Sequence, residues 1–186
     1  LLQFFFGTPM AYVVMLAPLG VVVYMSFNSN SMSLQAAQTA LWVYSALIGL
    51  SLAMIFIVYT NESIARVFFI TAATFGGMSI YGYTTKKDLS AFGSFLIMGL
   101  IGLIITSLVN LFLKSSAIQF FTSVIGLFIF IGLTAYDTQK IKNSYYQAGG
   151  NGELASKLAV FGALALYLDF INIFLYLLRF MGNRRD

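Results

Sequence analysis

The sequence predicts an all-α integral membrane protein, a helical bundle in which six membrane spans are visible. Of its 186 residues, 60% are hydrophobic and only 9% are charged, whereas soluble domains have about 25% charged residues. The apolar residues form runs near the length of about 20 residues that a helix needs to cross a bilayer. These runs do not alternate with the period of a β-strand. We therefore expect a single transmembrane domain over residues 1–186, with the lipid bilayer as its partner.

Short polar segments close the first three predicted spans. These segments read NSNS, TNES and TTKKD, and each follows directly on an apolar run. Polar and basic residues at the end of a run mark the membrane interface. The spans closed in this way are Met10–Phe27, Leu34–Tyr59 and Ile64–Tyr83.

The last three predicted spans are separated by one lysine and by a glycine-rich turn. Lys114 and two serines end the fourth span, and the turn between the last two spans lies near Gly149. The fifth span is expected to continue as a helix to Tyr146. These spans are Leu89–Leu113, Ala117–Ile141 and Leu154–Met181.

The ten basic residues lie scattered at the ends of these runs. A nucleic-acid-binding protein would cluster them on one face, so no nucleic acid is expected as a partner. The alternation of six spans puts five basic residues on each side of the membrane, so their count does not select an orientation. The residues expected on one side are Lys86, Lys87, Lys140, Lys142 and Lys157.

Absent residue types and the start of the chain set further expectations. The sequence has no cysteine and no histidine, which excludes disulfides, thiol catalysis, a Ser-His-Asp triad and a Cys/His zinc site. No tightly bound cofactor is expected. The chain begins at Leu1 without a methionine, and its first charged residue is Glu62. We expect a further segment upstream, such as another span.

Two aspartates lie inside the last two predicted spans, Asp137 and Asp169. A carboxylate within a span costs about 2.5–3.5 kcal/mol on insertion scales, so such residues usually have a function. If the two carboxyls meet, they resist joint ionisation and share a proton. Their oxygens are also ligands that suit calcium. The pair is therefore the predicted site for pH sensing and for binding a metal ion, and Asn172, Tyr136 and Tyr167 are candidates for supporting it.

Alternatives for each aspartate remain open at this stage. Asp137 lies near the end of its span, where it could reach water or pair with Lys140. Asp169 could be a structural carboxylate bonded to the backbone or to a tyrosine. The pair reaches one depth only if the last helix begins late, near Ser156, and the preceding helix continues well past Asn143. A start at Asn151 would offset the carboxyls by roughly 10 Å.

Two strings resemble the hallmark segments of the Bax inhibitor-1 family, bacterial branch. They are AYDTQKIK at residues 135–142 and ALYLDFINIFLYLLR at residues 165–179, and residues 69–90 resemble the family's middle region. The resemblance implies seven helices around a central last helix, of which this chain would lack the first. It also implies a pH-sensitive calcium leak in the bacterial inner membrane, with Asp137 and Asp169 as the sensor. The arginine latch of some relatives has no counterpart in residues 27–35, which contain no basic residue.

Two other functions compete with a calcium channel or transporter. Intramembrane aspartyl proteases also pair two aspartates, one of them after a tyrosine. They have Gly-x-Gly before the second aspartate, however, where this chain has Leu166, Tyr167 and Leu168. We therefore do not expect an enzyme. The remaining alternative, also implied by the resemblance, is a regulator that binds and inhibits a membrane-bound ATP-dependent protease.

Overall fold

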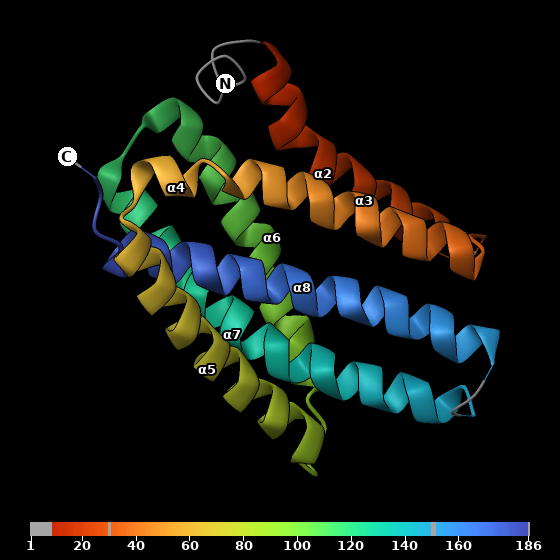
Figure 1. The fold of residues 1–186 in the computed structure, drawn as a ribbon. Coiled ribbons are helices and arrows are strands. Elements are labelled where there is room, and N and C mark those ends of the chain that lie inside the picture. The colour runs from red at the N-terminus through yellow and green to blue at the C-terminus, as the bar shows by residue number, and fades with distance from the viewer. Residues whose placement is uncertain (1–8, 30, 150–151, 186) are drawn as a thin grey trace.

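The computed structural model describes residues 9–29, 31–149 and 152–185, and these residues form helices joined by short connections. The predicted all-α fold is confirmed (Figure 1). The helices are α2 (Pro9–Asn28), α3 (Leu34–Leu52), α4 (Ile55–Val58), α5 (Asn61–Thr84), α6 (Ser90–Leu113), α7 (Ser116–Gln147) and α8 (Glu153–Met181).

Within the described residues, five segments are long and apolar enough to cross a membrane. They coincide with the second to sixth predicted spans. The first predicted span, Met10–Phe27, is helical as part of α2, and its crossing of the membrane stays a prediction. The five segments are Leu34–Val58, Asn61–Thr84, Ser90–Leu113, Ser116–Gln147 and Glu153–Met181.

The second predicted span is not the continuous helix that its apolar run suggested. The chain leaves α3 after Leu52 and resumes in the short helix α4. At the break, the Ala53 N–H is shared between the carbonyls of Gly49 and Leu50, at 3.1 and 3.2 Å. Such a three-centre bond is common where a helix ends. The sequence is apolar on both sides of the break, so hydropathy alone does not reveal it.

Side-chain caps explain where other helices begin. The Thr60 hydroxyl accepts a hydrogen bond from the Ser63 N–H, at 3.4 Å, so α5 begins at Asn61, earlier than predicted. Ser115 caps α7 in the same way through the N–H of Ile118. These bonds satisfy donors that have no partner within the helix. Polar residues at the ends of the apolar runs therefore set the limits of the helices.

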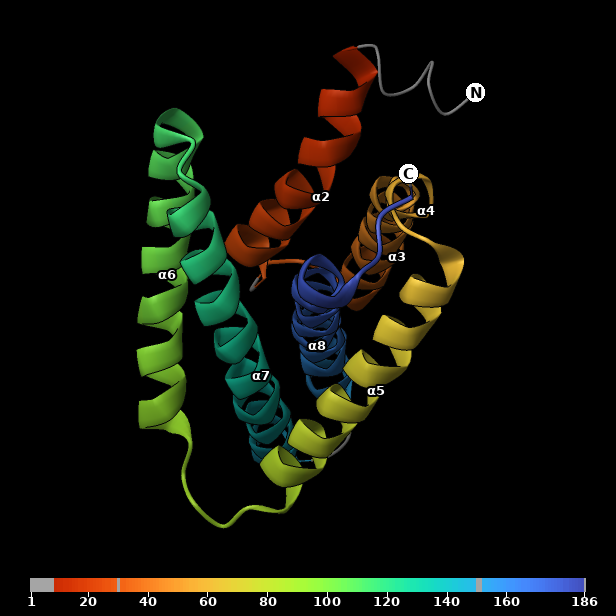
Figure 2. The same cartoon turned by 90° about the vertical axis from the view of Figure 1, so that its left-hand side faces the viewer.

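Helix α8 lies in the middle of the bundle, as predicted for the last helix. Viewed nearly along its axis, it is surrounded by α3, α5 and α7 (Figure 2). Helix α6 packs against the outer side of α7, and α2 packs against α3. Helices α3, α5 and α7 are therefore held directly against α8.

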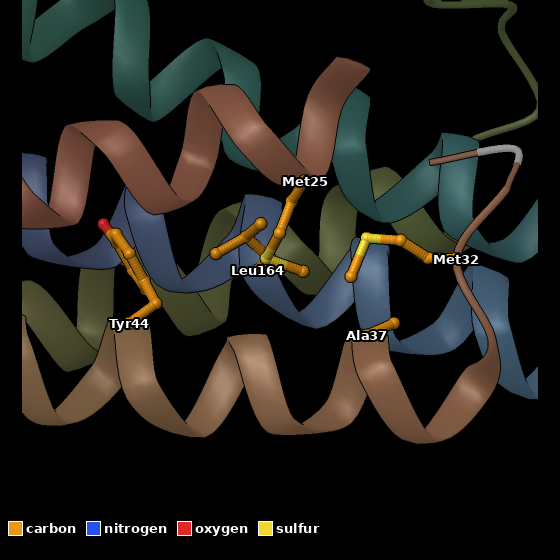
Figure 3. Packing of buried hydrophobic residues seen from close by; sticks show 5 residues of the cluster. All are labelled: Met25, Met32, Ala37, Tyr44 and Leu164. Carbon is orange, nitrogen blue, oxygen red and sulfur yellow. The ribbon is translucent and has the colours of Figure 1, made fainter. Parts of the chain in front are cut away.

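Three apolar clusters fix α8 against its neighbours. One joins α2, α3 and α8, and Figure 3 shows its buried side chains, which are Met25, Met32, Ala37, Tyr44 and Leu164. A second holds Ile173 against α6 and α7, and a third packs Phe174 and Leu178 against Ile64 and Val67 of α5. Because helices in lipid associate through close packing, these contacts determine how α8 is positioned in the bundle.

Candidate functional site

The antiparallel helices α7 and α8 approach closely at a glycine. Gly162 of α8 lies against Ile141 of α7, and a Cβ built on this glycine would be only 2.6 Å from Ile141 Cγ1. A small residue at such a point allows two helices in lipid to pack tightly. This contact fixes the register in which α7 and α8 face each other.

That register brings the two aspartates to nearly the same depth. Asp137 lies four residues before Ile141, and Asp169 lies seven residues after Gly162. The difference of three residues corresponds to about 4.5 Å along the helix axis. Side chains on a helix lean toward its N-terminus, and in an antiparallel pair these two lean toward each other. The remaining offset is thus closed by the side chains.

The connection between the helices differs from the expected one. Helix α8 begins at Glu153, one residue before the predicted span Leu154–Met181. The later start near Ser156, which alignment of the aspartates was expected to require, is not found. The predicted continuation of α7 past Asn143 is confirmed, because α7 ends at Gln147. Gly150 and Asn151 of the turn lie outside the described residues. Side-chain lean, and not a delayed helix, aligns the aspartates.

The structure brings the carboxyls of Asp137 and Asp169 together, and a hydrogen bond joins their side chains. Asp169 is buried with 3% of its surface exposed, and Asp137 is half-buried. A hydrogen bond between two carboxyls contains a proton that both groups can hold. Asp169 Oδ2 is also buried and has no hydrogen-bond partner among the described residues. An unsatisfied buried oxygen of this kind calls for a functional explanation.

A cavity of about 390 Å³ opens beside Asp137, toward the turn between α7 and α8. We call it the basic cavity, because Lys140 and Lys157 line it together with Asp137. It lies between the α2–α3 turn and the last two helices, and apolar side chains form much of its wall. Its lining residues are Ser29, Asp137, Lys140, Ile141, Ser144, Leu154, Lys157, Leu158, Phe161, Gly162 and Ala165.

A second cavity, of about 600 Å³, lies between α2, α3, α4 and α8. We call it the apolar cavity, since most of its lining is aliphatic. Ala165 of the basic cavity precedes Asp169 by one helical turn, and Asn172 of the apolar cavity follows it by about one turn. Along α8, Asp169 thus lies close to residues that line each of the two cavities. The lining of the apolar cavity is Pro18, Val22, Tyr44, Ile48, Ser51, Leu52, Met54, Ile55, Leu168, Ile171, Asn172 and Leu175.

The three candidate supporting residues make their described contacts elsewhere. The Asn172 side-chain amide donates to the Leu168 carbonyl of its own helix, at 2.8 Å. The Tyr136 ring packs against Gly93 of α6. The Tyr167 ring packs edge-on against Tyr44 of α3, with ring centroids 5.8 Å apart. These residues help to place α7 and α8, and their direct support of the carboxyls stays a prediction.

Two residues that line the site were not singled out as site members from the sequence. Lys157 and Ser29 reach the basic cavity from different parts of the fold, and no local spacing predicts their meeting with Asp137. Lys140 was weighed only as an ion-pair partner for Asp137. Its spacing of three residues from Asp137, repeated at nearly the same interval by Ser144, was the available signal for a polar face on α7.

The oxygens of the two carboxyls are ligands of the kind that a hard cation takes. Within the described residues, no group of three or more acidic, histidine or cysteine side chains could hold a metal ion. Calcium takes 6–8 oxygen ligands, and the pair supplies only the oxygens of Asp137 and Asp169. The remaining ligands would have to come from water or backbone carbonyls.

Comparison with known proteins identifies the family. The family model described as "Inhibitor of apoptosis-promoting Bax1" matches residues 1–186. The chain belongs to the Bax inhibitor-1 family. The resemblance seen in the sequence is thereby confirmed over the whole chain.

Several bacterial proteins are similar to this chain in sequence. An uncharacterized protein of Rickettsia prowazekii is 56% identical over 181 residues, which cover 97% of this chain and 76% of that protein. The inner membrane protein YbhL of Escherichia coli is 51% identical, with 91% of this chain and 73% of that protein covered. An uncharacterized protein of Caulobacter vibrioides is 48% identical, with 96% and 72% covered. Together with the five apolar helices, these relatives confirm the prediction of an integral membrane protein.

Proposed function

We propose that this member of the Bax inhibitor-1 family is a pH-sensitive calcium channel or transporter gated by Asp137 and Asp169. The observation that supports the proposal is the hydrogen bond between two carboxyls in the interior of the bundle. The cavities near Asp169 provide room for an ion before and after the pair. Protons and calcium would then compete for the same oxygens.

The pair controls passage through its charge. With a shared proton, the two carboxyls are held together and carry one negative charge at most. When this proton leaves, two carboxylates at hydrogen-bond distance repel each other. They can then separate, or take up a divalent cation whose charge balances both groups. Asp169 Oδ2, which is buried without a partner, is available as an additional ligand for that cation. Protonation thus favours the closed arrangement.

Calcium flux into proteoliposomes at pH 5–8 tests the proposal. We expect Asp137→Asn and Asp169→Asn to remove the pH dependence of the flux, because the amide keeps the size of the side chain but does not titrate. Asp88→Asn is the matched control, since Asp88 lies in the exposed α5–α6 connection. If both pair variants retain the pH profile of the unmodified chain, the proposed gate does not exist.

The competing functions stay predictions, and each has a direct test. Binding to a membrane-bound ATP-dependent protease would be seen by co-purification, and it should survive replacement of either aspartate. Proteolysis would be seen as cleavage of a membrane peptide that is lost in Asp169→Asn. Neither function draws on the two cavities, which is why we favour ion passage.

A further inference from the structure

The basic cavity has a combination of charged and apolar residues that the proposed gating does not require. It combines the positive charge of Lys140 and Lys157 with an apolar wall formed by Leu158, Phe161 and Ile141. Asp137 is the acidic residue among the described residues of this lining, and its side chain is hydrogen-bonded to that of Asp169. The formal charges of these described lining residues, two lysines and one carboxyl, sum to a positive value. Its chemistry therefore complements a ligand that is anionic at one end and apolar at the other.

We propose that the basic cavity binds the headgroup of an anionic phospholipid. The phosphate would lie between Lys140 and Lys157, and Ser144 would offer a hydroxyl donor beside them. The first part of an acyl chain would follow the apolar wall. Basic pockets between transmembrane helices bind lipid phosphates by this combination of charge and apolar contact. The proposal concerns binding and does not depend on the calcium pathway.

The position of the cavity favours a lipid over a soluble phosphate. Lys140 lies near the end of α7, and Lys157 lies in the second turn of α8, so both belong to the level at which spans meet the headgroups. Phe161 lies one helical turn further into the span than Lys157 and provides apolar surface for an acyl chain. A soluble phosphoester would gain nothing from Phe161.

The same lysines stand beside the proposed ion gate. A cation that approaches Asp137 through this cavity meets the positive charge of Lys140 and Lys157. A bound phosphate would neutralise part of that charge and lower the electrostatic barrier. If the proposed function holds, an anionic lipid bound in this cavity is therefore an activator of calcium flux.

Native mass spectrometry of the full chain in detergent, titrated with phosphatidylglycerol, tests the binding itself. We expect Lys140→Gln combined with Lys157→Gln to weaken binding by about 30-fold, on the basis of the typical contribution of two lysines to anionic-lipid attraction. The control is Lys86→Gln combined with Lys87→Gln, which removes the same charge from exposed residues outside the cavity lining. It should change binding by less than about twofold.

Further measurements distinguish a lipid headgroup from a soluble phosphate and control for misfolding of the variants. Phosphatidylcholine with the same acyl chains should bind weakly, and glycerol 3-phosphate should not displace phosphatidylglycerol. Lys140→Arg combined with Lys157→Arg keeps the charge and should retain binding. Unchanged binding in the glutamine variant, or equal loss in the control, would overturn the site. Displacement by glycerol 3-phosphate would instead assign it to a soluble phosphoester. Because lipid binding is read without calcium, failure of the ion gate would leave these results unaffected.

Discussion

The two cavities beside Asp169 differ in chemistry, although each is lined by α8. The basic cavity includes Lys140, Lys157 and Asp137 and lies toward the α7–α8 turn. The apolar cavity is lined chiefly by aliphatic side chains, with Tyr44, Ser51 and Asn172 as its polar members. A charged cavity admits water and ions, whereas an apolar cavity of molecular size can remain dry. We therefore expect the carboxyl pair to mark the boundary between a hydrated side and a dry side.

This difference indicates where an ion meets its main barrier. Hydrophobic constrictions close channels by excluding water, and the apolar cavity has the composition for such a constriction. Beyond it, α8 is packed closely, because Ile173 and Leu178 are at most 1% exposed. The residues after α8 are also tied to α5, since the Asn183 N–H donates to Ser63 Oγ at 2.9 Å. Access to the pair is accordingly expected from the basic side.

The largest expected effect on stability and on the pH response comes from displacing α7, the helix that carries Asp137 of the carboxyl pair. A Cβ on Gly82 of α5 would lie 2.1 Å from the carbonyl oxygen of Ala135, two residues before Asp137. Backbone cannot move aside as a flexible side chain can, so Gly82→Ala should destabilise the fold by about 1–3 kcal/mol. Thermal unfolding in detergent measures this change, and the separation of α5 from α7 should also weaken the pH response of calcium flux.

Gly77→Ala on the same helix is the control for this change. No atom lies within 4 Å of a Cβ at Gly77, so its substitution should leave the unfolding temperature unchanged or raise it slightly through the better helix propensity of alanine. Equal unfolding temperatures for the two variants would show that the α5–α7 contact does not position Asp137.

An intermediate effect on calcium flux is expected from a polar substitution that brings water into the apolar cavity. Ile48 of α3 lines the apolar cavity, and Ile48→Asn would place an amide there that attracts water. We expect calcium flux to rise by about tenfold, the result of lowering the barrier by ~1.4 kcal/mol. Leu50→Asn is the control on the same helix, because Leu50 is 54% exposed on the outer surface. Equal flux in both variants would place the barrier outside the apolar cavity.

The contrast between the cavities also shows which features of the fold and of the site can be predicted from the sequence. Run length and polar ends predicted the spans within a few residues, since the bilayer fixes both. The cost of a carboxylate in lipid singled out Asp137 and Asp169. The central place of α8 came from the resemblance to the family and not from hydropathy, which treats all spans alike.

Other features depend on contacts between distant segments. The basic cavity needs Ser29, Lys140 and Lys157 to meet from three elements, and no local pattern encodes that meeting. The contact of the Tyr167 ring with Tyr44 of α3 likewise joins segments far apart in the sequence. Gly162 sets the register between α7 and α8, and the helix breaks after Leu52, but the sequence stays apolar around both positions. Hydropathy therefore could not locate either feature.

The smallest effect is expected at Asp88, a carboxyl outside both cavities that serves as a comparison for the buried pair. The Ser90 hydroxyl and backbone N–H hold the pKa of Asp88 below its ordinary value, the latter by a hydrogen bond of 2.9 Å to Oδ1. A carboxyl with a lowered pKa in the folded state stabilises the fold above its unfolded pKa, and this contribution is lost as the pH falls through the folded pKa. Asp88→Asn should therefore lower the unfolding temperature slightly at neutral pH, and the difference from the unmodified chain should vanish in acid. Because Asp88 remains ionised from pH 5 to 8, the pH profile of calcium flux should be the same in this variant. A shifted profile would mean that the pH response does not belong to the carboxyls at the boundary between the cavities.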